Sequence, residues 1–158
     1  MESARPAQRE DAERCAALCR AALAELEGQR GGALFARRET GLVAKALLRP
    51  GGLDRLLGDE RRQVVVGVLD GVVVGLIVAR VDMVGEAPVG VVDACYVEPE
   101  ARGVGVGRAM LDAAVAWLTA SGCRGVDASA LPGDRATKRF FEGAGFKARL
   151  VVMHRPVV

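Results

Sequence analysis

One stretch of the sequence decides the fold. It reads Val91-Val92-Asp93-Ala94-Cys95-Tyr96-Val97-Glu98-Pro99-Glu100-Ala101-Arg102-Gly103-Val104-Gly105-Val106-Gly107-Arg108. Its first half predicts a strand that stops at Glu98-Pro99, and three alternating glycines then lead directly into a helix. The first N–H groups of a helix lack intrahelical partners and lie at the positive end of its dipole, and glycine lets an anion approach the backbone closely. The turn therefore predicts a phosphate-binding site, with Arg102 and Arg108 beside it.

The glycine spacing excludes two common nucleotide-binding motifs. A P-loop requires a Lys and then a Ser or Thr directly after its last glycine, and neither follows Gly107. The dinucleotide fingerprint G-x-G-x-x-G lacks its third glycine, whether it is counted from Gly103 or from Gly105. The pattern that fits is R-x-x-G-x-G, as Arg102-x-x-Gly105-x-Gly107.

The segments around this stretch predict a mixed α/β sheet layered with helices. Upstream, two β-branched runs flank Asp70-Gly71, which is the signal of a type I′ hairpin. The remaining expected elements are a strand at 3–7, helices at 9–26 and 33–48, a short helical turn at 53–57, strands at 63–69, 72–81 and 90–97, a helix at 106–121, a strand at 125–130, a helix from Asp134 to Gly145 and a last strand at 146–154. This order of elements indicates neither an all-parallel sheet nor a β-sandwich.

The composition predicts one globular domain over residues 1–158. Half of the residues (51%) are hydrophobic and 27% are charged, so there is ample apolar surface to bury. Lys and Arg number 22 against 20 Asp and Glu, which leaves a net charge of +2. That charge is too small for a general nucleic-acid or membrane-surface binder, and we expect neither partner.

Rare residue types limit the available chemistry and the expected location. The single histidine is His154, which excludes a multi-histidine metal site and leaves a Ser–His–Asp triad only at the C-terminus. We expect no metal, and we expect the four cysteines to be buried thiols that act as small apolar residues.

The N-terminus has no apolar signal segment, and Asp70-Gly71 interrupts the longest apolar stretch, Val64 to Val81. We therefore expect a reduced, cytoplasmic protein.

The motif Arg102-x-x-Gly105-x-Gly107 resembles the pyrophosphate loop of the GNAT superfamily of acyl-CoA-dependent N-acyltransferases. The resemblance covers most of the chain, because three separated segments, the second of which overlaps this motif, follow the family pattern in the same order. They are Arg5-Pro6-Ala7 with Asp11, then Val97-Glu98-Pro99-Glu100-Ala101-Arg102-Gly103, and finally Phe140-Phe141-Glu142-Gly143-Ala144-Gly145-Phe146, which is similar to F-Y-E-x-x-G-F.

The resemblance implies a fold, a cosubstrate and a reaction. The fold is a central, mostly antiparallel twisted sheet with a splayed parallel strand pair and about four flanking helices. The cosubstrate is acetyl-CoA or another acyl-CoA, and the acetyl group moves to a primary amine of an undetermined small molecule or protein by direct attack. The strand Cys95–Val97 would splay from 125–130, and the backbone N–H of Cys95 or Tyr96 would polarise the thioester carbonyl. The implied cofactor-binding residues are Cys95, Tyr96, Val97, Arg102, Gly103, Val104, Gly105, Val106, Gly107, Arg108 and Phe141.

The sequence offers one candidate for the catalytic base and one for the acid. Asp93 is our candidate base, because it lies in an apolar strand where desolvation raises a carboxyl pKa; the alternative is a strand carboxylate paired with arginine. Cys95 is expected on the same face as Asp93, as an inert thiol. The family's acid, a Tyr, is replaced by Phe141, so the thiolate leaves unprotonated or takes a proton from water. Tyr96 is the only phenol, either a substitute acid or a packing residue.

Two rival functions stay open, and so do the acceptor and the assembly. Because of Phe141, the chain is alternatively a non-catalytic acyl-CoA-binding domain of the same fold; the glycine turn also allows a nucleotide-binding module. Acceptor specificity in the family tends to come from the first two helices, here 26–48, whose charges are mixed. The strand Lys147–Val152 is a candidate edge for pairing in a homodimer.

Overall fold

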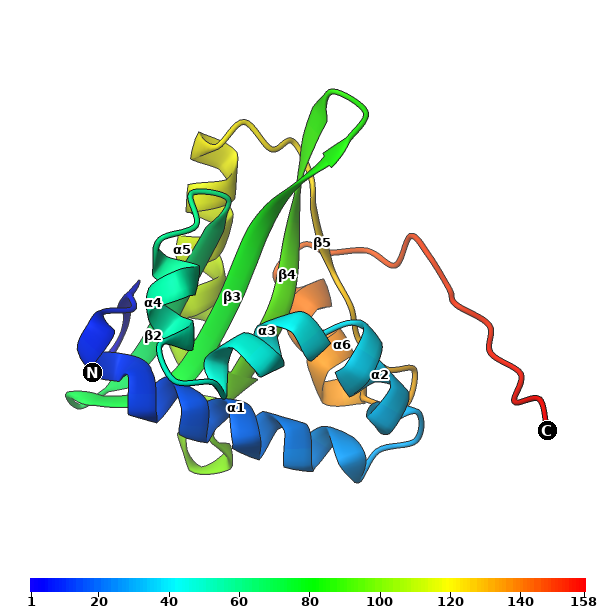
Figure 1. Cartoon of the computed structure of the whole chain (residues 1–158), viewed down its shortest axis with the longest axis horizontal. Coiled ribbons are helices and arrows are strands. Elements are labelled where there is room, and N and C mark those ends of the chain that lie inside the picture. The colour runs from blue at the N-terminus through cyan, green and yellow to red at the C-terminus, as the bar shows by residue number, and fades with distance from the viewer.

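The computed structural model describes the side chains of residues 1–40 and 43–158 and contains one five-stranded sheet (Figure 1). The strands lie in sequence order, β1-β2-β3-β4-β5. They are β1 (Glu2–Pro6), β2 (Arg62–Leu69), β3 (Val72–Val84), β4 (Ala87–Val97) and β5 (Val126–Ala128). Consecutive strands from β1 to β4 pair antiparallel, whereas β4 and β5 pair parallel. The predicted mixed sheet with one parallel pair is confirmed.

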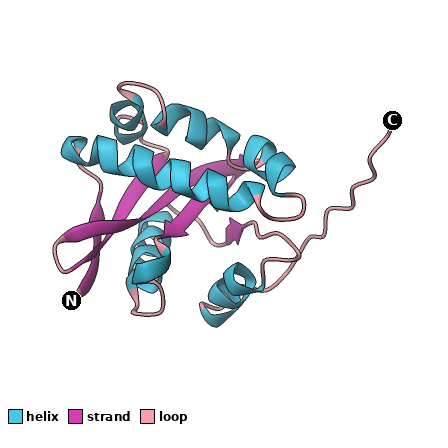
Figure 2. Ribbon diagram, turned by 90° about the horizontal axis from the view of Figure 1, so that it is seen from below, coloured by secondary structure: helices cyan, strands magenta, loops and turns pink.

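Helices cover both faces of the sheet (Figure 2). One layer holds α1 (Ala12–Glu27), α2 (Gly32–Arg38), α3 (Gly41–Leu47) and α4 (Gly52–Leu57), and the other holds α5 (Val106–Ala120) and α6 (Arg135–Gly143). Two 3-10 turns, η1 (Arg9–Asp11) and η2 (Pro99–Ala101), precede α1 and follow β4. The architecture is three layers, with the sheet in the middle.

Each helical layer buries its own core against the sheet. Alternation along the strands divides the apolar side chains between the two faces, because successive residues point to opposite sides. Leu18, Val64 and Val78 belong to the cluster under α1. The second cluster, against α5, includes Ile77 and Met110, which are fully buried. These two cores fix β3 and β4 at the centre of the molecule.

Turn and cap residues act as their types predict. Asp70 and Gly71 have φ values of 49° and 83°, the left-handed pair that a type I′ hairpin requires. Gly122 follows α5 with φ 89°. The carboxylate of Asp134 accepts a hydrogen bond from the Thr137 N–H at 3.1 Å, which caps the start of α6.

The expected helix over 33–48 is wrong, because the structure has two helices there. The chain breaks between α2 and α3, where the hydroxyl of Thr40 donates to the carbonyl oxygen of Ala36 at 3.0 Å. Neither glycine nor proline marks the break within 38–40. The division of this segment and the short α4 raise the number of flanking helices above the four expected. The strand expected at 125–130 is also shorter, since β5 spans Val126–Ala128 only.

The last predicted strand, over 146–154, is wrong as well. Residues 147–158 form no helix or strand, and in Figure 1 this tail runs away from the body of the protein. Its apolar side chains are exposed, for example Leu150 at 69% and Met153 at 88%. Arg149 pairs with Asp127 of β5. A strand needs a neighbour to complete its backbone hydrogen bonds, and the tail reaches none within one chain.

Candidate active site

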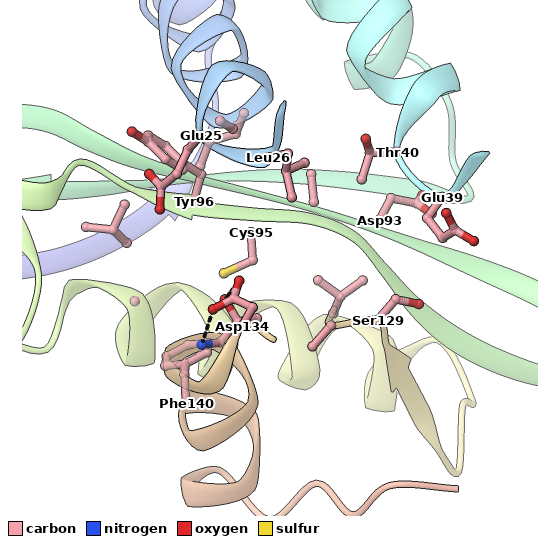
Figure 3. Close-up of a pocket in the computed structure, with 18 of the residues that line it drawn as sticks. Glu25, Leu26, Glu39, Thr40, Asp93, Cys95, Tyr96, Ser129, Asp134 and Phe140 are labelled. Atoms are coloured by element: carbon pink, nitrogen blue, oxygen red, sulfur yellow. Dashed lines mark hydrogen bonds between the residues drawn. The ribbon is translucent and has the colours of Figure 1, made fainter. Parts of the chain in front are cut away.

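The predicted splay between β4 and β5 is present. The two strands pair only from Gly90 to Val92. Beyond this point β4 continues beside β3, while the chain after β5 turns away through Ser129. A cavity of about 840 Å³ opens at the separation, between α1, α2 and α3 on one side and α6 on the other (Figure 3). The parallel pair therefore supplies both the sheet edge and the entrance to the site.

A β-bulge at Asp93 redirects the side chains of β4. Val78 of β3 faces Ala94 and Ala79 faces Val92, so Asp93 is the extra residue without a partner. Bulges re-aim side chains and increase local twist. Asp93 and Cys95 consequently point to opposite sides of the strand (Figure 3), and the expectation that they share a face is wrong. Simple alternation counts this extra residue as an ordinary one.

The carboxylate of Asp93 is held by two arginines. Its Oδ1 accepts a hydrogen bond from Nε of Arg80 at 3.0 Å, and its Oδ2 accepts one from Nη1 of Arg62 at 3.1 Å. Only 7% of the Asp93 side chain is exposed. Asp59 and Asp82 pair with the outer sides of the same arginines, which makes a chain of five alternating charges. The ion pairing with arginine, which was expected as the alternative to a role as base, is thus present, and Asp93 also lines the cavity.

The glycine turn forms a cradle of free backbone donors. Gly103 and Gly105 adopt φ values of 80° and 98°, which side-chain-bearing residues rarely adopt, and α5 begins directly after Gly105. Within the described part of the chain, the amides from Gly103 to Arg108 donate no hydrogen bond. A Cβ atom at Gly107 would lie 3.2 Å from Cε2 of Phe140, so the turn also packs tightly against α6. The residues present fit a bound diphosphate.

Protein groups hold both arginines that flank the turn. Nε of Arg102 donates to the carbonyl oxygen of Val97 at 2.8 Å, and Nη2 donates to Oε2 of Glu25 at 2.8 Å. Its guanidinium also lies 5.5 Å from the centre of the Tyr96 ring. Nε of Arg108 donates to Asp112 at 2.9 Å. Arg102 therefore joins the glycine turn to helix α1.

The thiol and phenol of β4 are both neutral groups. Burial raises the pKa of the Cys95 thiol to about 12, so the nucleophilic thiolate is scarce. The Cys95 sulfur points towards Asp134 in Figure 3. Burial chiefly raises the pKa of Tyr96 as well, and its ring points towards α1, away from Cys95. The role of Tyr96 as an acid stays a prediction, and its observed contact is with Arg102.

Two phenylalanine rings of α6 line the cavity. Phe141 is 7% exposed, and its ring centre lies 5.2 Å from that of Phe140 and 5.2 Å from that of Phe146. Edge-to-face and tilted contacts at this distance stabilise an aromatic cluster. The cavity wall therefore carries an apolar surface at the position where the family pattern has a tyrosine.

Several cavity residues were given no individual role from the sequence: Glu25, Glu39, Thr40, Ser129, Asp134 and Phe140. Phe140 lies in the segment that resembles F-Y-E-x-x-G-F, and Glu39 and Thr40 lie in the segment 26–48 expected to contact the acceptor. Ser129 lies in the strand expected over 125–130, whereas Glu25 and Asp134 belong to none of the predicted site segments. Across residues 1–40 and 43–158, no group of three His, Cys, Asp or Glu side chains is placed to hold a metal ion. No helix in these same residues is long and apolar enough to cross a membrane.

Known proteins share this fold and this sequence pattern. The chain is 34% identical over 73 residues to an aminoglycoside N(6')-acetyltransferase type 1 of Stenotrophomonas maltophilia, a match covering 45% of this chain. The chain spans about half the length of that curated relative, since the match covers 48% of it.

Solved structures match over nearly the whole chain. AAC(6')-Iy in complex with a bisubstrate analogue, CoA-S-monomethyl-acetylneamine, superposes with a TM-score of 0.73 at 20% identity, covering 100% of this chain and 99% of that one. A mutant of the protein BH1408 of Bacillus halodurans superposes with a TM-score of 0.77 at 17% identity, covering 98% and 99%. These likenesses confirm the fold.

The family itself follows from the sequence profile. The profile of the acetyltransferase (GNAT) family matches residues 33–146, which include the splayed strand, the glycine turn and α6. This span is more than half of the chain. The predicted resemblance is confirmed, and the chain belongs to the acetyltransferase (GNAT) family.

Proposed function

We propose that the protein is an N-acetyltransferase that moves the acetyl group of acetyl-CoA to a primary amine by direct attack. The observation that carries the proposal is the opening between β4 and β5 beside the unpaired amides of Gly103–Arg108. Such an opening has room for an extended thioester arm, and the amide N–H groups can donate hydrogen bonds to its diphosphate. Membership of the acetyltransferase family and the CoA complexes of the structural relatives support this cosubstrate.

In this proposal the backbone does most of the binding. The amides of the glycine turn hold the diphosphate, and the open edge of β4 at Cys95 or Tyr96 presents an N–H to the thioester carbonyl. Preorganised donors of this kind contribute several kcal/mol to an acyl-transfer step, on the order of 3 kcal/mol for one donor. Acetyl-CoA supplies the activated acetyl group when it is bound.

Proton transfer falls to Asp93 and water. The ammonium form of the acceptor first loses one proton to water and becomes the neutral nucleophile. A C–N bond then forms as the C–S bond breaks, the nitrogen loses its second proton to Asp93 directly or through water, and the sulfur leaves with the bonding electron pair. Arg62 and Arg80 orient the Asp93 carboxylate for this role. Phe141 has no proton to give, so the departing sulfur takes its proton from water.

Thermal unfolding with different ligands tests the proposal first. Acetyl-CoA and CoA are expected to raise the melting temperature, whereas ATP and NAD are not, because a ligand stabilises only the state that binds it. Release of the CoA thiol in the presence of an amine panel then tests catalysis. A shift with CoA but no transfer would indicate a non-catalytic binding domain. A shift with ATP or NAD alone would indicate a nucleotide-binding module.

The proposal extends to location and assembly. We place the protein in the cytoplasm, where acetyl-CoA is available, and propose a homodimer formed through the exposed tail at Lys147–Val152. The apolar exposure of Leu150 and Val151, at 69% and 73%, supports pairing of this tail with a second copy. Sedimentation of the wild type and of Val151→Lys tests the dimer, because a charge in that contact is expected to yield monomers.

A further inference from the structure

The part of the cavity that lies under α1, α2 and α3, which we call the acceptor half, has an apolar lining on α1. Helix α1 carries a stripe of small and apolar side chains at helical spacing, Cys19, Ala22, Leu23 and Leu26. The N-terminal part of the same face, at Cys15 and Leu18, is buried against the sheet. Towards the end of α1 the stripe leaves the core and lines the cavity, where Leu26 points inward (Figure 3). Within this stripe Cys19 belongs to the core and Leu23 packs against it, whereas Ala22 and Leu26 line the cavity partly exposed.

The neighbouring walls continue this apolar surface. Phe35 of α2 and Val91 of β4 line the cavity and are partly exposed. Val43, Leu47 and Leu76 line its deeper part, and each is buried to 96% or more. When a ligand covers exposed apolar surface inside a cavity, the free energy of binding becomes more favourable by about 25 cal/mol per Å² of apolar area removed from water. The acceptor half therefore favours an apolar partner.

The charges of the cavity cancel. Four carboxylates line it, at Glu25, Glu39, Asp93 and Asp134, together with four arginines, at Arg38, Arg80, Arg102 and Arg108. Glu25 is paired with Arg102, Asp93 with two arginines, and Asp134 caps α6. Among the described residues, Glu39 is the cavity carboxylate whose side chain forms no ion pair or hydrogen bond. A ligand with several ammonium groups needs several unpaired carboxylates, because a buried charge is costly unless it is paired.

We infer that the acceptor is a primary amine on an apolar body, an alkylamine or arylalkylamine with one charge, rather than a polycation. The inference rests on the proposed function and deepens it. The apolar stripe of α1 and Phe35 would cover the body of such an amine, and Glu39 matches its single ammonium group before the proton is lost. The curated relative is named for aminoglycosides, which are polycations, so this chain would differ from it in acceptor class.

A comparison of three acceptors tests the inference. Acetyl transfer to phenethylamine, to ethanolamine and to sisomicin is followed by CoA release under the same conditions. We expect kcat/KM for phenethylamine to exceed that for ethanolamine and for sisomicin by about tenfold or more, because an apolar pocket discriminates by about 10- to 200-fold per group that it covers. The preference is expected to persist in high salt, which screens charge pairing.

Two variants show where the preference arises. Phe35→Ala is expected to lower kcat/KM for phenethylamine by about tenfold and the value for ethanolamine by less, because ethanolamine has no apolar body for the ring to cover. Leu34→Ala is the matched control, because Leu34 is adjacent, is 44% exposed and does not line the cavity. Leu26→Ala repeats the test from α1 if Phe35→Ala unfolds. The circular dichroism spectrum confirms folding in each case.

The outcomes separate the inference from the proposed function. Equal or higher kcat/KM with sisomicin would overturn the inference and leave the acetyltransferase in place. A preference for hexanoyl-CoA over acetyl-CoA with ethanolamine, lost in Phe35→Ala, would also overturn it, because the apolar half would then hold the acyl chain. Acetyl-CoA binding without transfer to any amine would instead contradict the proposed function.

Discussion

Arg102 and Glu25 lie 77 positions apart in sequence, yet Nη2 of the arginine donates to Oε2 of the glutamate at 2.8 Å. Glu25 belongs to α1, which roofs the acceptor half, whereas Arg102 precedes the glycine turn. The ion pair therefore connects the two halves of the site. The pair also engages the Arg102 guanidinium, which the sequence analysis predicts to contact the diphosphate.

Replacing Glu25 should free Arg102 for the diphosphate. We expect Glu25→Gln to tighten CoA binding by about two- to fivefold, the range that a half-exposed ion pair supports, and Arg102→Gln to weaken it. Isothermal titration with CoA measures both, with Glu27→Gln on the same helix as the control. Weaker binding in Glu25→Gln would show that Arg102 serves to hold the turn against α1 rather than to contact phosphate.

The phosphate cradle is tested at Gly105. We expect Gly105→Glu to abolish detectable CoA binding, because it forces a side chain into a backbone with φ 98° and places a negative charge among the free amides. Gly85→Glu is the control for strain, since Gly85 also has positive φ, at 63°, but lies at a hairpin tip. A CoA Kd for Gly105→Glu equal to that of Gly85→Glu would rule out this loop as the binding site.

The proton acceptor is tested at Asp93. Asp93→Asn is expected to lower kcat by about 10²- to 10⁴-fold, the usual contribution of a general base, with an unchanged CoA Kd. Asp82→Asn is the control, because Asp82 pairs with the same Arg80 but is exposed. If Asp93→Asn retains the wild-type kcat, the carboxylate only positions its two arginines.

The start of α1 gives a prediction for stability against pH. Asp11 is 8% exposed and accepts hydrogen bonds from Nη1 of Arg5 at 2.7 Å and from the Gln8 N–H at 2.8 Å. The bond from Arg5 is the main cause that lowers the pKa of Asp11 below its ordinary value of 3.8, against the effect of burial. Because the folded pKa is the lower one, the stabilisation exists above the unfolded pKa and is lost as the pH falls through the folded value.

We therefore expect Asp11→Asn to lower the free energy of unfolding by about 1 kcal/mol at neutral pH, discounted because Arg5 is 40% exposed. The difference from wild type should shrink as the pH falls below about 4. Urea denaturation at a series of pH values measures it, with the exposed neighbour Glu10→Gln as control. A difference that is constant down to pH 2.5 or so would contradict the assigned role of the Asp11 charge.

Local sequence signals predicted most of the fold correctly. The hairpin at Asp70-Gly71, the cap at Asp134 and the strand–turn–helix at the glycine turn each depend on residues that are close in sequence. At the break between α2 and α3 the Thr40 hydroxyl donates to the carbonyl oxygen of Ala36, and Gly41, where α3 begins, is the only local residue type that could have indicated it. The tail after Phe146 has the composition of a strand, but composition does not supply the neighbouring strand that it would need.

The site was predictable where it follows local motifs, namely the strand and glycine turn over 93–108 and the segment that contains Phe141. The cradle from Gly103 to Arg108 is continuous in sequence, so its position and its open amides follow from the pattern. The Asp93 bulge could not be predicted, because strand alternation has no sign of an extra residue. Glu25 reaches the cavity through the packing of α1 on the sheet, and Glu39 through the packing of α2 against α1 and α3, which are tertiary relationships.

Direct detection of the products tests the central claim best. Wild-type protein is incubated with acetyl-CoA and phenethylamine, and the released CoA thiol and the N-acetylated amine are quantified together, with Gly105→Glu as the control. The account predicts that both products appear in equal amounts with wild type and that neither appears with Gly105→Glu. No acetylated amine from any member of the acceptor panel, although acetyl-CoA is bound, would contradict it.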